Sequence, residues 1–506
     1  MKVLYIAAEC KPFSKTGGVG DVTGELPPAL REQKVDIEIA TPLYGCINKR
    51  YIGESVLQYS VPFHGVNERV EIHAGRLNGV PVNFVSNRTY FENIYTKATV
   101  PPNSLPPLAA GDYSKPYVNS EEVAFYDDAL RFSFFSKACL RLIEKMKPDI
   151  VHINDWLLGY LFGWMEIENF PQKRILTVHN VGYQGNIGRE TIKGWDIEDI
   201  LSNKLTAGLF ADPRRGWKSV NALRLGLELS DMVNTVSPNY AREMTLPEDQ
   251  QRYFEGGKGL AKVAKRLYDA GKLIGILNGF DYKFEPTAEK FIDTVNRKKM
   301  MKKALSGEFA DPDSFLLGFV GRAVEQKFKL LAEQINGKSV LEHILDLPGI
   351  NVAILATGLP QYESFLKKIA HTKNYSVTVA FDKDKAQQIS LGSNVFLMPS
   401  LFEPCGITQM ESLSNATPPL VRWTGGLVDT VIPHTATNGT GFGFSGASRQ
   451  EVLRNLIDCC REAMNVYRLE REHFQEVQRQ GFQKRFLWSD SARQYIERMY
   501  VPVMAK

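Results

Sequence analysis

The sequence predicts an α/β protein built from two doubly wound domains that face each other. Short apolar runs alternate with helical patterns in both halves of the chain, and the alternation breaks once, in a charged, glycine-containing stretch. Such alternation is typical of parallel sheets with helices on both faces, and 506 residues exceed a single core. We expect a first domain over 1–245, a hinge over 246–272, a second domain over 273–484 and a final helix over 485–506.

The composition is that of an ordinary globular protein and disfavours several functional classes. Apolar residues make up 43% of the chain and charged residues 23%. The net charge of +4 comes without a block of Lys and Arg, so we expect no nucleic-acid partner. The apolar runs fall short of the roughly 18 residues that span a bilayer, so we expect no membrane partner. The first run, VLYIAA, ends at Glu9 and is interpreted as a buried strand rather than a signal peptide.

The cysteine and histidine patterns favour neither a metal nor a disulfide. The six cysteines show no CxxC pair and no zinc spacing, and the eight histidines include no HExxH motif. We therefore expect free thiols, a reducing compartment, no metal and no cofactor.

A glycine-rich loop follows the first predicted strand, residues 3–8, and precedes a helix that ends near Arg31. The loop KTGGVGDV places Lys15, Gly17 and Gly18 between the strand and the helix. Bare backbone and a mobile cation at such a turn suit a phosphate group. A simple turn with a solvated lysine is the alternative. No GxxxxGK[ST] motif occurs, which disfavours a P-loop nucleotidase.

The next stretch is predicted to be less regular. Residues 35–40 form a second strand, and apparent hairpins continue to about residue 120. Residues 98–118 are rich in Pro, Ala and Ser and are interpreted as a binding loop or a disordered insert. A helix is expected from Tyr126 to about Lys147.

Polar residues follow two further predicted strands, residues 149–153 and 175–178. Asp155 and Trp156 come after the first strand, and His179 and Asn180 come after the second, ahead of Tyr183. Because parallel strands share one carboxyl edge, these side chains point to a single crevice. A histidine at a strand end can also be purely structural.

Two helices are predicted before the hinge. Residues 217–229 show an amphipathic pattern, and Ser237-Pro238 provides the usual cap and first residue of the next helix.

The second half carries cations at another strand–helix turn. The predicted strand Phe315–Val320 leads into GRAVEQK, where Arg322 and Lys327 can converge on one anion. Two solvated charges are the alternative. Asp382-Lys383-Asp384 matches a DxD metal pattern, but it opens a predicted helix and is interpreted as an N-terminal cap.

The whole chain is organised around the stretch from Pro399 to Thr430. A buried strand, Val395–Met398, precedes Glu403, and a helix over Ile407–Leu413 follows, with Pro404 suited to a first helical position. Further on, the run Thr424, Gly425 and Gly426 lets bare backbone approach a ligand before another helix. One acid and two helix N-termini at strand ends suit a sugar diphosphate.

Taken together, these motifs resemble the bacterial glycogen synthase and plant starch synthase family over nearly the whole chain. The matching motifs are KTGGVGDV at 15–22, DDALRF at 127–132, HINDW at 152–156, HNVGYQG at 179–185, GILNG at 275–279, FEPCG at 402–406, TGGL at 424–427 and WSDSA at 488–492. The resemblance implies the GT-B arrangement of two Rossmann-like domains, with a last helix that crosses back to the first domain. It also implies transfer of glucose from ADP-glucose to the non-reducing end of an α-1,4-glucan with retention of configuration, and no metal.

The resemblance implies a role for each matching residue. The catalytic set, of which the cations hold the diphosphate and the acid holds the sugar, is Lys15, Arg322, Lys327 and Glu403. The donor-binding set is Gly17, Gly18, Phe381, Cys405, Gly406, Ile407, Glu411, Thr424, Gly425 and Gly426. The acceptor and sugar side is Asp21, Asp155, Trp156, His179, Asn180 and Tyr183. Glu411 lies eight residues after Glu403, and on one helix this spacing would bring both acids to the same face, although an exposed helix acid is the alternative.

The chain departs from the family pattern at four positions. Leu157 stands where many bacterial members have His, Leu401 where Arg is common, Trp423 where a basic residue is common, and Asn394 where the family has Asp. UDP-glucose as donor, a small acceptor, or an inactive glucan-binding paralogue therefore stay open as alternatives. The expected location is the cytoplasm, or the plastid stroma for a plant-type form.

Overall fold

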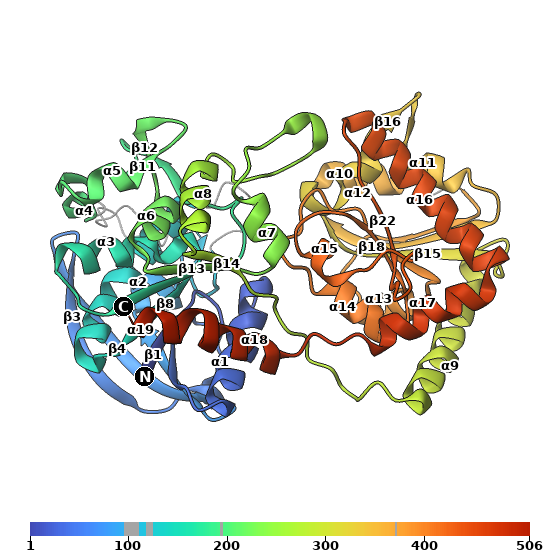
Figure 1. The fold of residues 1–506 in the computed structure, drawn as a ribbon. Helices are drawn as coiled ribbons and strands as arrows, with labels where there is room; N and C mark the ends of the chain where they lie inside the picture. The colour runs from blue at the N-terminus through green and yellow to red at the C-terminus, as the bar shows by residue number, and fades with distance from the viewer. Residues whose placement is uncertain (96–110, 118–124, 193–195, 370–371, 506) are drawn as a thin grey trace.

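A computed structural model describes residues 1–95, 111–117, 125–192, 196–369 and 372–505. The chain forms two lobes, the first mostly from blue to green and the second from yellow-green to red-orange, and both chain ends lie in the first lobe (Figure 1). Among the described residues, no helix is both long and apolar enough to cross a bilayer. Most of the loop predicted at 98–118 lies outside the described residues.

The first lobe is built on a nine-stranded sheet in the order β14-β13-β9-β8-β1-β2-β5-β4-β3. Its strands are β1 (Lys2–Ile6), β2 (Asp36–Pro42), β3 (Ser55–Phe63), β4 (Val66–Leu77), β5 (Val80–Ser86), β8 (Ile150–Asn154), β9 (Lys173–Val178), β13 (Met232–Thr235) and β14 (Leu273–Gly275). The strands run parallel from β14 to β5, and β4 and β3 add an antiparallel meander. The central strand β1 is fully buried from Val3 to Ile6, because helices cover both faces of the sheet.

The second lobe is built on a six-stranded parallel sheet in the order β19-β18-β15-β20-β21-β22. Its strands are β15 (Phe315–Ala323), β18 (Ile350–Gly358), β19 (Tyr375–Thr378), β20 (Val395–Met398), β21 (Pro419–Arg422) and β22 (Phe442–Phe444). Followed along the chain, these strands take the doubly wound order 3-2-1-4-5-6. The parallel part of the first sheet repeats this order with one further strand, so the predicted pair of Rossmann-like domains is confirmed.

Helices cover both sheets. In the first lobe they are α1 (Gly18–Glu32), α2 (Phe125–Met146), α3 (Gly159–Ile167), α4 (Glu198–Ser202), α5 (Thr206–Phe210), α6 (Ala222–Leu229), α7 (Pro238–Glu243) and α8 (Ala261–Asp269). In the second lobe they are α9 (Ala288–Leu305), α10 (Glu325–Ala332), α11 (Val340–Leu345), α12 (Pro360–Lys368), α13 (Lys383–Gly392), α14 (Thr408–Ser414), α15 (Gly426–Thr430), α16 (Arg449–Leu469) and α17 (Arg471–Gln483). Small sheets pair β6 (Ile94–Tyr95) with β7 (Gly111–Asp112), β16 (Gln334–Ile335) with β17 (Lys338–Ser339), and β12 (Gly216–Asn221) with β10 (Asn186–Gly188) and β11 (Ala211–Asp212).

The last segment crosses back from the second lobe to the first, as predicted (Figure 1). It consists of α18 (Trp488–Tyr495), a π-helical turn and α19 (Val501–Met504). Asn234 on β13 donates to the Tyr495 hydroxyl at 2.8 Å, and the Tyr500 hydroxyl lies 2.8 Å from Nδ1 of His152 on β8. The C-terminal helices are therefore part of the first core.

The predicted helix over residues 217–229 is wrong in its first part. Residues 216–221 form β12, which pairs with β10 and β11, and α6 begins only at Ala222. Asn221 caps α6 by accepting a hydrogen bond from the Arg224 N–H at 2.8 Å. Because α6 follows β12 directly, the apolar residues of the two elements together resemble the pattern of one amphipathic helix.

The hinge predicted at 246–272 is also corrected. Helix α8 buries Ala264 and Leu267 in the core of the first lobe, and β14 pairs in parallel with β13. The first sheet therefore extends to Gly275, past the expected boundary at residue 272. The lysines and arginines of α8 had hidden its narrow apolar face in the sequence.

Candidate active site

Each sheet reverses its strand order at one point, and the predicted site residues follow the strands at these two points. In the first sheet the reversal lies between β1 and β8, which lead to Lys15 and Asp155. In the second sheet it lies between β15 and β20, which lead to Arg322 and Glu403. Doubly wound sheets bind ligands in the crevice outside these strand ends.

In the second lobe, the FEPCG turn and the TGG loop pack against each other through bare backbone. Gly425 has φ +49°, and a Cβ there would overlap the Glu403 carbonyl oxygen. The Gly426 N–H donates to that same carbonyl at 2.9 Å, at the start of α15. Only glycine fits this approach, so the two motifs form one unit.

Pro404 was predicted to suit the first position of a helix, and this prediction is wrong. Helix α14 begins at Thr408, and the Pro404 carbonyl instead accepts a hydrogen bond from the Ser237 hydroxyl of the first lobe at 2.6 Å. Because Glu403 lies ahead of the helix, the expectation that Glu403 and Glu411 share one helical face is also wrong. Glu411 lies exposed in the first turn of α14.

Lys327 and Glu403 meet directly. The Lys327 ammonium forms an ion pair with the Glu403 carboxylate, to which the Ser400 hydroxyl also donates at 3.2 Å. Lys327 lies in the first turn of α10, and Glu403 is only 7% exposed. Arg322 lies exposed near the end of β15, ahead of the same helix. An acid and a lysine therefore occupy the switch point of this sheet, with a second cation on the neighbouring strand end.

The other predicted donor residues differ in their surroundings. Cys405 is buried with Met410 and Leu413, and burial raises the pKa of its thiol to about 12, so it serves packing. Gly406 has φ +77°, which favours glycine, and Ile407 precedes α14. Phe381 is 83% exposed.

In the first lobe, the predicted glycine-rich loop wraps around an acid that the sequence analysis missed. Buried Glu9 accepts hydrogen bonds from the backbone N–H groups of Thr16 and Gly17, the latter at 3.1 Å. Lys15 extends from this loop and forms an ion pair with Asp21 at 2.6 Å, and α1 begins at Gly18. The position of Glu9 directly behind the first strand was the signal for it.

The two polar strand ends of the first lobe come together as predicted. The Asp155 carboxylate accepts from the backbone N–H of His179 at 2.7 Å, and burial raises the pKa of Asp155 to about 7. His179 lies 2.9 Å from Asn154 through Nε2, and burial lowers its pKa to about 3. Asp155 itself has φ +57°, a strained conformation for a non-glycine residue.

The loop after His179 presents the remaining predicted side chains. The Asn180 side chain accepts from the Gly182 N–H at 2.8 Å, and Tyr183 is 44% exposed. Trp156 is buried, and its ring packs directly on Gly185.

A second missed residue joins the two lobes. Glu243, at the end of α7, accepts from the Gly425 N–H of the TGG loop at 2.9 Å and from the Asn239 side chain at 2.9 Å. Thr424 is buried beside it. The sequence carried no signal for this contact, because it joins residues 182 apart.

All four departures from the family pattern make contacts within the fold, and Leu401 packs against the hydrophobic core of the second lobe. Leu157 is buried, and the Trp423 ring lies against Gly443. The Asn394 amide oxygen accepts from the Leu316 N–H at 2.8 Å and from the Lys302 ammonium at 3.1 Å.

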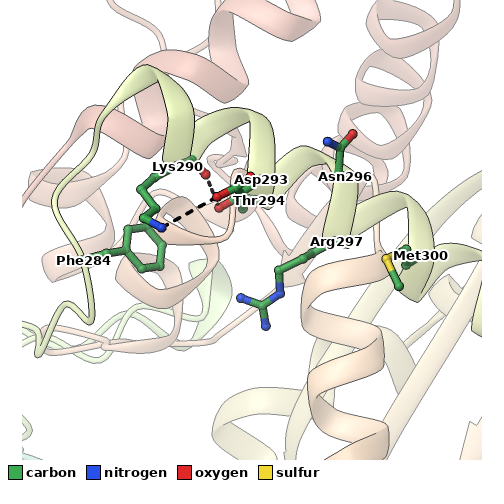
Figure 2. A pocket seen from close by; sticks show the side chains of 7 residues that line it. All are labelled: Phe284, Lys290, Asp293, Thr294, Asn296, Arg297 and Met300. Carbon is green, nitrogen blue, oxygen red and sulfur yellow. Dashed lines mark hydrogen bonds and ion pairs between the residues drawn. The ribbon is translucent and has the colours of Figure 1, made fainter.

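Two surface pockets lie away from the predicted residues. One pocket has a volume of about 420 Å³ and lies along α9. Figure 2 shows the residues that line it, which are Phe284, Lys290, Asp293, Thr294, Asn296, Arg297 and Met300. A second pocket, of about 820 Å³, lies on the first lobe beside β4 and β5. Neither contains a predicted site residue, so the site is defined by the switch points.

Comparison with known proteins agrees with this geometry. The family model for the starch synthase catalytic domain matches residues 2–266. A glycogen synthase from Lactobacillus acidophilus is 32% identical, and the match covers 98% of each chain. A glycogen synthase from Hydrogenovibrio crunogenus is 31% identical over 98% of this chain and 99% of its own.

Solved structures give the same result. The catalytic domain of starch synthase IV from Arabidopsis thaliana, bound to ADP and acarbose, matches with a TM-score of 0.77 and 25% identity over 100% of this chain and 99% of that chain. A sucrose-phosphate synthase from Thermosynechococcus elongatus matches with a TM-score of 0.57 at 15% identity and shows the fold alone. The chain is therefore a GT-B glycosyltransferase that belongs to the glycogen and starch synthase family.

Proposed function

We propose that this enzyme transfers glucose from ADP-glucose to the non-reducing end of an α-1,4-glucan, with retention of configuration. The observation that carries the proposal is the Lys327–Glu403 pair at the switch point of the second sheet. A neighbouring cation, Arg322, and the glycine-lined TGG loop complete a site suited to a sugar diphosphate. The ADP bound by the starch synthase IV relative supports the choice of donor.

The cations are assigned to the departing diphosphate. Negative charge accumulates on the diphosphate as the glycosidic bond breaks, and fixed cations stabilise that charge. We assign this task to Arg322 and Lys327, with Lys15 joining from the first lobe. In the structure, Lys15 is paired with Asp21 and Lys327 with Glu403. Donor binding therefore exchanges two internal ion pairs for contacts with phosphate oxygens.

The remaining predicted residues are assigned to the sugar, the base and the acceptor. Glu403 and the N–H groups that follow it hold the hydroxyls of the transferred glucose, and Phe381 lies against the base. Asp21, Asn180 and Tyr183 line the acceptor side, and the backbone carbonyl after Trp156 faces the reacting carbon. Closure of the two lobes would exclude water and align donor with acceptor.

We propose that no metal ion takes part, because three cationic side chains supply the positive charge. Turnover with ADP-glucose is then expected to be unchanged by EDTA. Loss of activity in EDTA that returns with added Mg²⁺ would contradict this part of the proposal.

The decisive experiment is parallel radiolabel transfer from ADP-glucose and from UDP-glucose to glycogen and to maltose. We expect label from ADP-glucose in glycogen. Preferential use of UDP-glucose would contradict ADP-glucose as the donor. Preferential labelling of maltose would contradict a glucan polymer as the acceptor. Glycogen binding without transfer from either donor would identify a binding paralogue.

We also propose a cytoplasmic location. The relatives compared above are bacterial glycogen synthases, and all six cysteines are free thiols, as suits a reducing compartment.

A further inference from the structure

The loop between α7 and α8 reaches from the first lobe to the second (Figure 1). We call residues 249–258 the arm. Its tip inserts Tyr253, only 9% exposed, into the hydrophobic core of the second lobe. The Arg422 guanidinium, buried at the end of β21, donates to the carbonyls of Tyr253 at 2.9 Å and Arg252 at 2.6 Å. The tip is thus anchored to the second lobe by burial and by charge-assisted hydrogen bonds.

A second anchor holds the tip from α16. Arg449 donates from Nε to the Gln250 carbonyl at 3.0 Å, and its guanidinium lies 5.1 Å from the centre of the Tyr253 ring. Arg449 itself is exposed. Its removal would therefore loosen the tip without opening a core.

The base of the arm packs behind the loop that carries Asn180 and Tyr183. Glu255 is only 7% exposed and accepts a hydrogen bond from the Tyr240 hydroxyl at 3.4 Å. That hydroxyl in turn accepts from the backbone N–H of Val181 at 3.1 Å. A chain of contacts therefore runs from the arm through Tyr240 to the middle of this loop.

Direct contacts reinforce the chain. The second Glu255 oxygen, Oε1, lies against Gly182, where any Cβ would be in conflict with it. Within the described residues Oε1 has no hydrogen-bond partner, and Lys258 approaches it at 3.7 Å. The Lys258 carbonyl accepts from the Gln184 side chain at 3.0 Å, and its ammonium lies 5.9 Å from the Phe402 ring, next to Glu403. The arm thus touches the acceptor side of one lobe and the donor side of the other.

We propose that Glu255 and Tyr240 are positioning residues that hold the Asn180–Tyr183 loop in the acceptor-binding conformation, and that docking of the arm on the second lobe sets this support. The inference rests on the proposed function, since it assigns that loop to the glucan. It predicts that damage to the arm weakens glucan binding while the donor site, built from β15, β20 and β21, is left intact.

The test compares Tyr240→Phe and Glu255→Gln with the wild-type enzyme, with separate KM values for glycogen and ADP-glucose. Each variant keeps the shape of its side chain and weakens a buried hydrogen bond, so we expect the KM for glycogen to rise about 10-fold. The KM for ADP-glucose is expected to stay close to wild type, and circular dichroism should show an intact fold. An unchanged KM for glycogen in both variants would overturn the proposal.

Matched controls separate this role from general packing. Tyr160 is a buried tyrosine of the same lobe whose hydroxyl has no hydrogen-bond partner in the described part of the chain, and Glu248 is an exposed acid just ahead of the arm. Tyr160→Phe and Glu248→Gln should leave the KM for glycogen unchanged. An equal rise in these controls would show that the effect is not specific to the arm, and would also overturn the proposal.

Docking on the second lobe is tested from α16. Arg449→Gln should raise the KM for glycogen several-fold, although Arg449 touches only the tip of the arm. Arg454→Gln, which changes another exposed arginine of α16, should not. If Arg449→Gln and Arg454→Gln show the same KM for glycogen, the support of the Asn180–Tyr183 loop does not depend on docking of the arm, and this part of the proposal is wrong.

A pH profile adds a readout that a purely structural role would not change. Burial raises the pKa of Glu255 to about 7; the groups that face it are Lys258 on the arm and Tyr240 and Glu243 on α7. Protonation below pH 7 removes the charge that holds the Tyr240 hydroxyl, so the wild-type KM for glycogen should rise as the pH falls from 8 to 6. In Glu255→Gln the KM should be high and less dependent on pH. Failure of wild type to label glycogen would instead refute the proposed function itself.

Discussion

Lys298 is a buried lysine whose partners in the described residues are all neutral. Its ammonium donates to the carbonyls of Leu391 at 3.1 Å and Ser393, and to the Thr417 hydroxyl. Burial lowers its pKa to about 7, and the neighbouring Lys302 acts in the same direction. A buried charge without a counter-charge is costly, so this residue opposes folding wherever it is protonated in the unfolded chain.

Lys298 therefore makes stability depend on pH. Between pH 7 and about 10.4, where an unfolded lysine titrates, the unfolded chain binds the proton and the folded chain does not. The free energy of unfolding should rise with pH in this window, by up to about 1.4 kcal/mol per pH unit from this group. Urea unfolding at pH 7, 8 and 9 measures the slope.

The contrast with Lys298→Met isolates the contribution of this residue. The variant should lose the pH slope, whereas Lys299→Met, at an exposed position of the same helix, should keep it. Equal slopes in wild type and Lys298→Met would show that the lysine remains charged in the folded state.

Lys327 is the residue whose loss should cost most activity. Lys327→Ala is expected to lower kcat by about 100-fold or more, because one preorganised contact to the developing charge is worth roughly 3 kcal/mol. Circular dichroism should show an intact fold. Lys329→Ala, two residues further along α10, is the control, because Lys329 forms an ion pair with Glu325 on its own helix. Near-normal turnover in Lys327→Ala would contradict the assignment.

The sequence predicted the location of a motif residue in the fold best where the motif is local. Lys15, Asp155 and Glu403 each follow a recognisable strand, so their edge of a sheet could be deduced from strand order. Glu243 could not be found in this way, because its contact with Gly425 depends on how two lobes meet. The pairing of Lys327 with Glu403 likewise spans 76 residues, and no periodic pattern encodes it.

At the scale of elements, the close approach of the FEPCG turn and the TGG loop depends on Gly425. A side chain there would require φ +49° from a non-glycine residue and would overlap the Glu403 carbonyl. Gly425→Ala should therefore push Glu403 out of place, lower kcat/KM at least 10-fold and destabilise the fold by about 1–3 kcal/mol. Steady-state kinetics and urea unfolding measure both effects.

A glycine in open surroundings provides the comparison. At Gly307 no described atom lies within 4 Å of an added Cβ, so Gly307→Ala should change neither quantity noticeably. Wild-type kinetics in Gly425→Ala would mean that the two motifs do not need their close contact.

Elements with a clear apolar run or a clear cap were predicted well. Elements whose apolar pattern merges with that of a neighbour or is interrupted by charged residues were not. The strand at Val395–Met398 and the Asp382 cap of α13 match the structure. Strand β12 was missed because it borders a helix directly. Helix α8 was assigned to a hinge rather than to the first lobe because it carries few apolar residues among many charges. Tertiary contacts determine both elements. Strand β12 pairs with β10 and β11, and helix α8 packs against β14.

At the scale of the whole molecule, strand alternation in each half was enough to predict two doubly wound sheets. The order 3-2-1-4-5-6 in both sheets then explains why the motif residues gather at two edges. The links between the lobes could not be predicted from composition. The arm, the Ser237–Pro404 contact and the Glu243–Gly425 contact all join segments that carry no sequence signal for each other.

The C-terminal crossing makes the stability of the first lobe depend on the last residues of the chain. Tyr500 is fully buried, and its hydroxyl faces His152, whose pKa burial lowers to about 3. His152 is thus neutral, and the hydroxyl satisfies one of its ring nitrogens inside the core. Tyr500→Phe leaves that nitrogen unpaired, so the free energy of unfolding should fall by about 1–3 kcal/mol.

Because the contact between Tyr500 and His152 lies in the first lobe, the loss of stability should appear in the thermal unfolding transition of that lobe. In calorimetry of Tyr500→Phe, the transition of the first lobe should shift down. ADP, most of whose contacts are assigned to the second lobe, should stabilise the transition of that lobe as in wild type. Tyr268→Phe, at an exposed tyrosine of α8, should leave both unchanged. An equal downward shift of both transitions would instead mean that the two lobes unfold as one unit, held together by the crossing and by the arm.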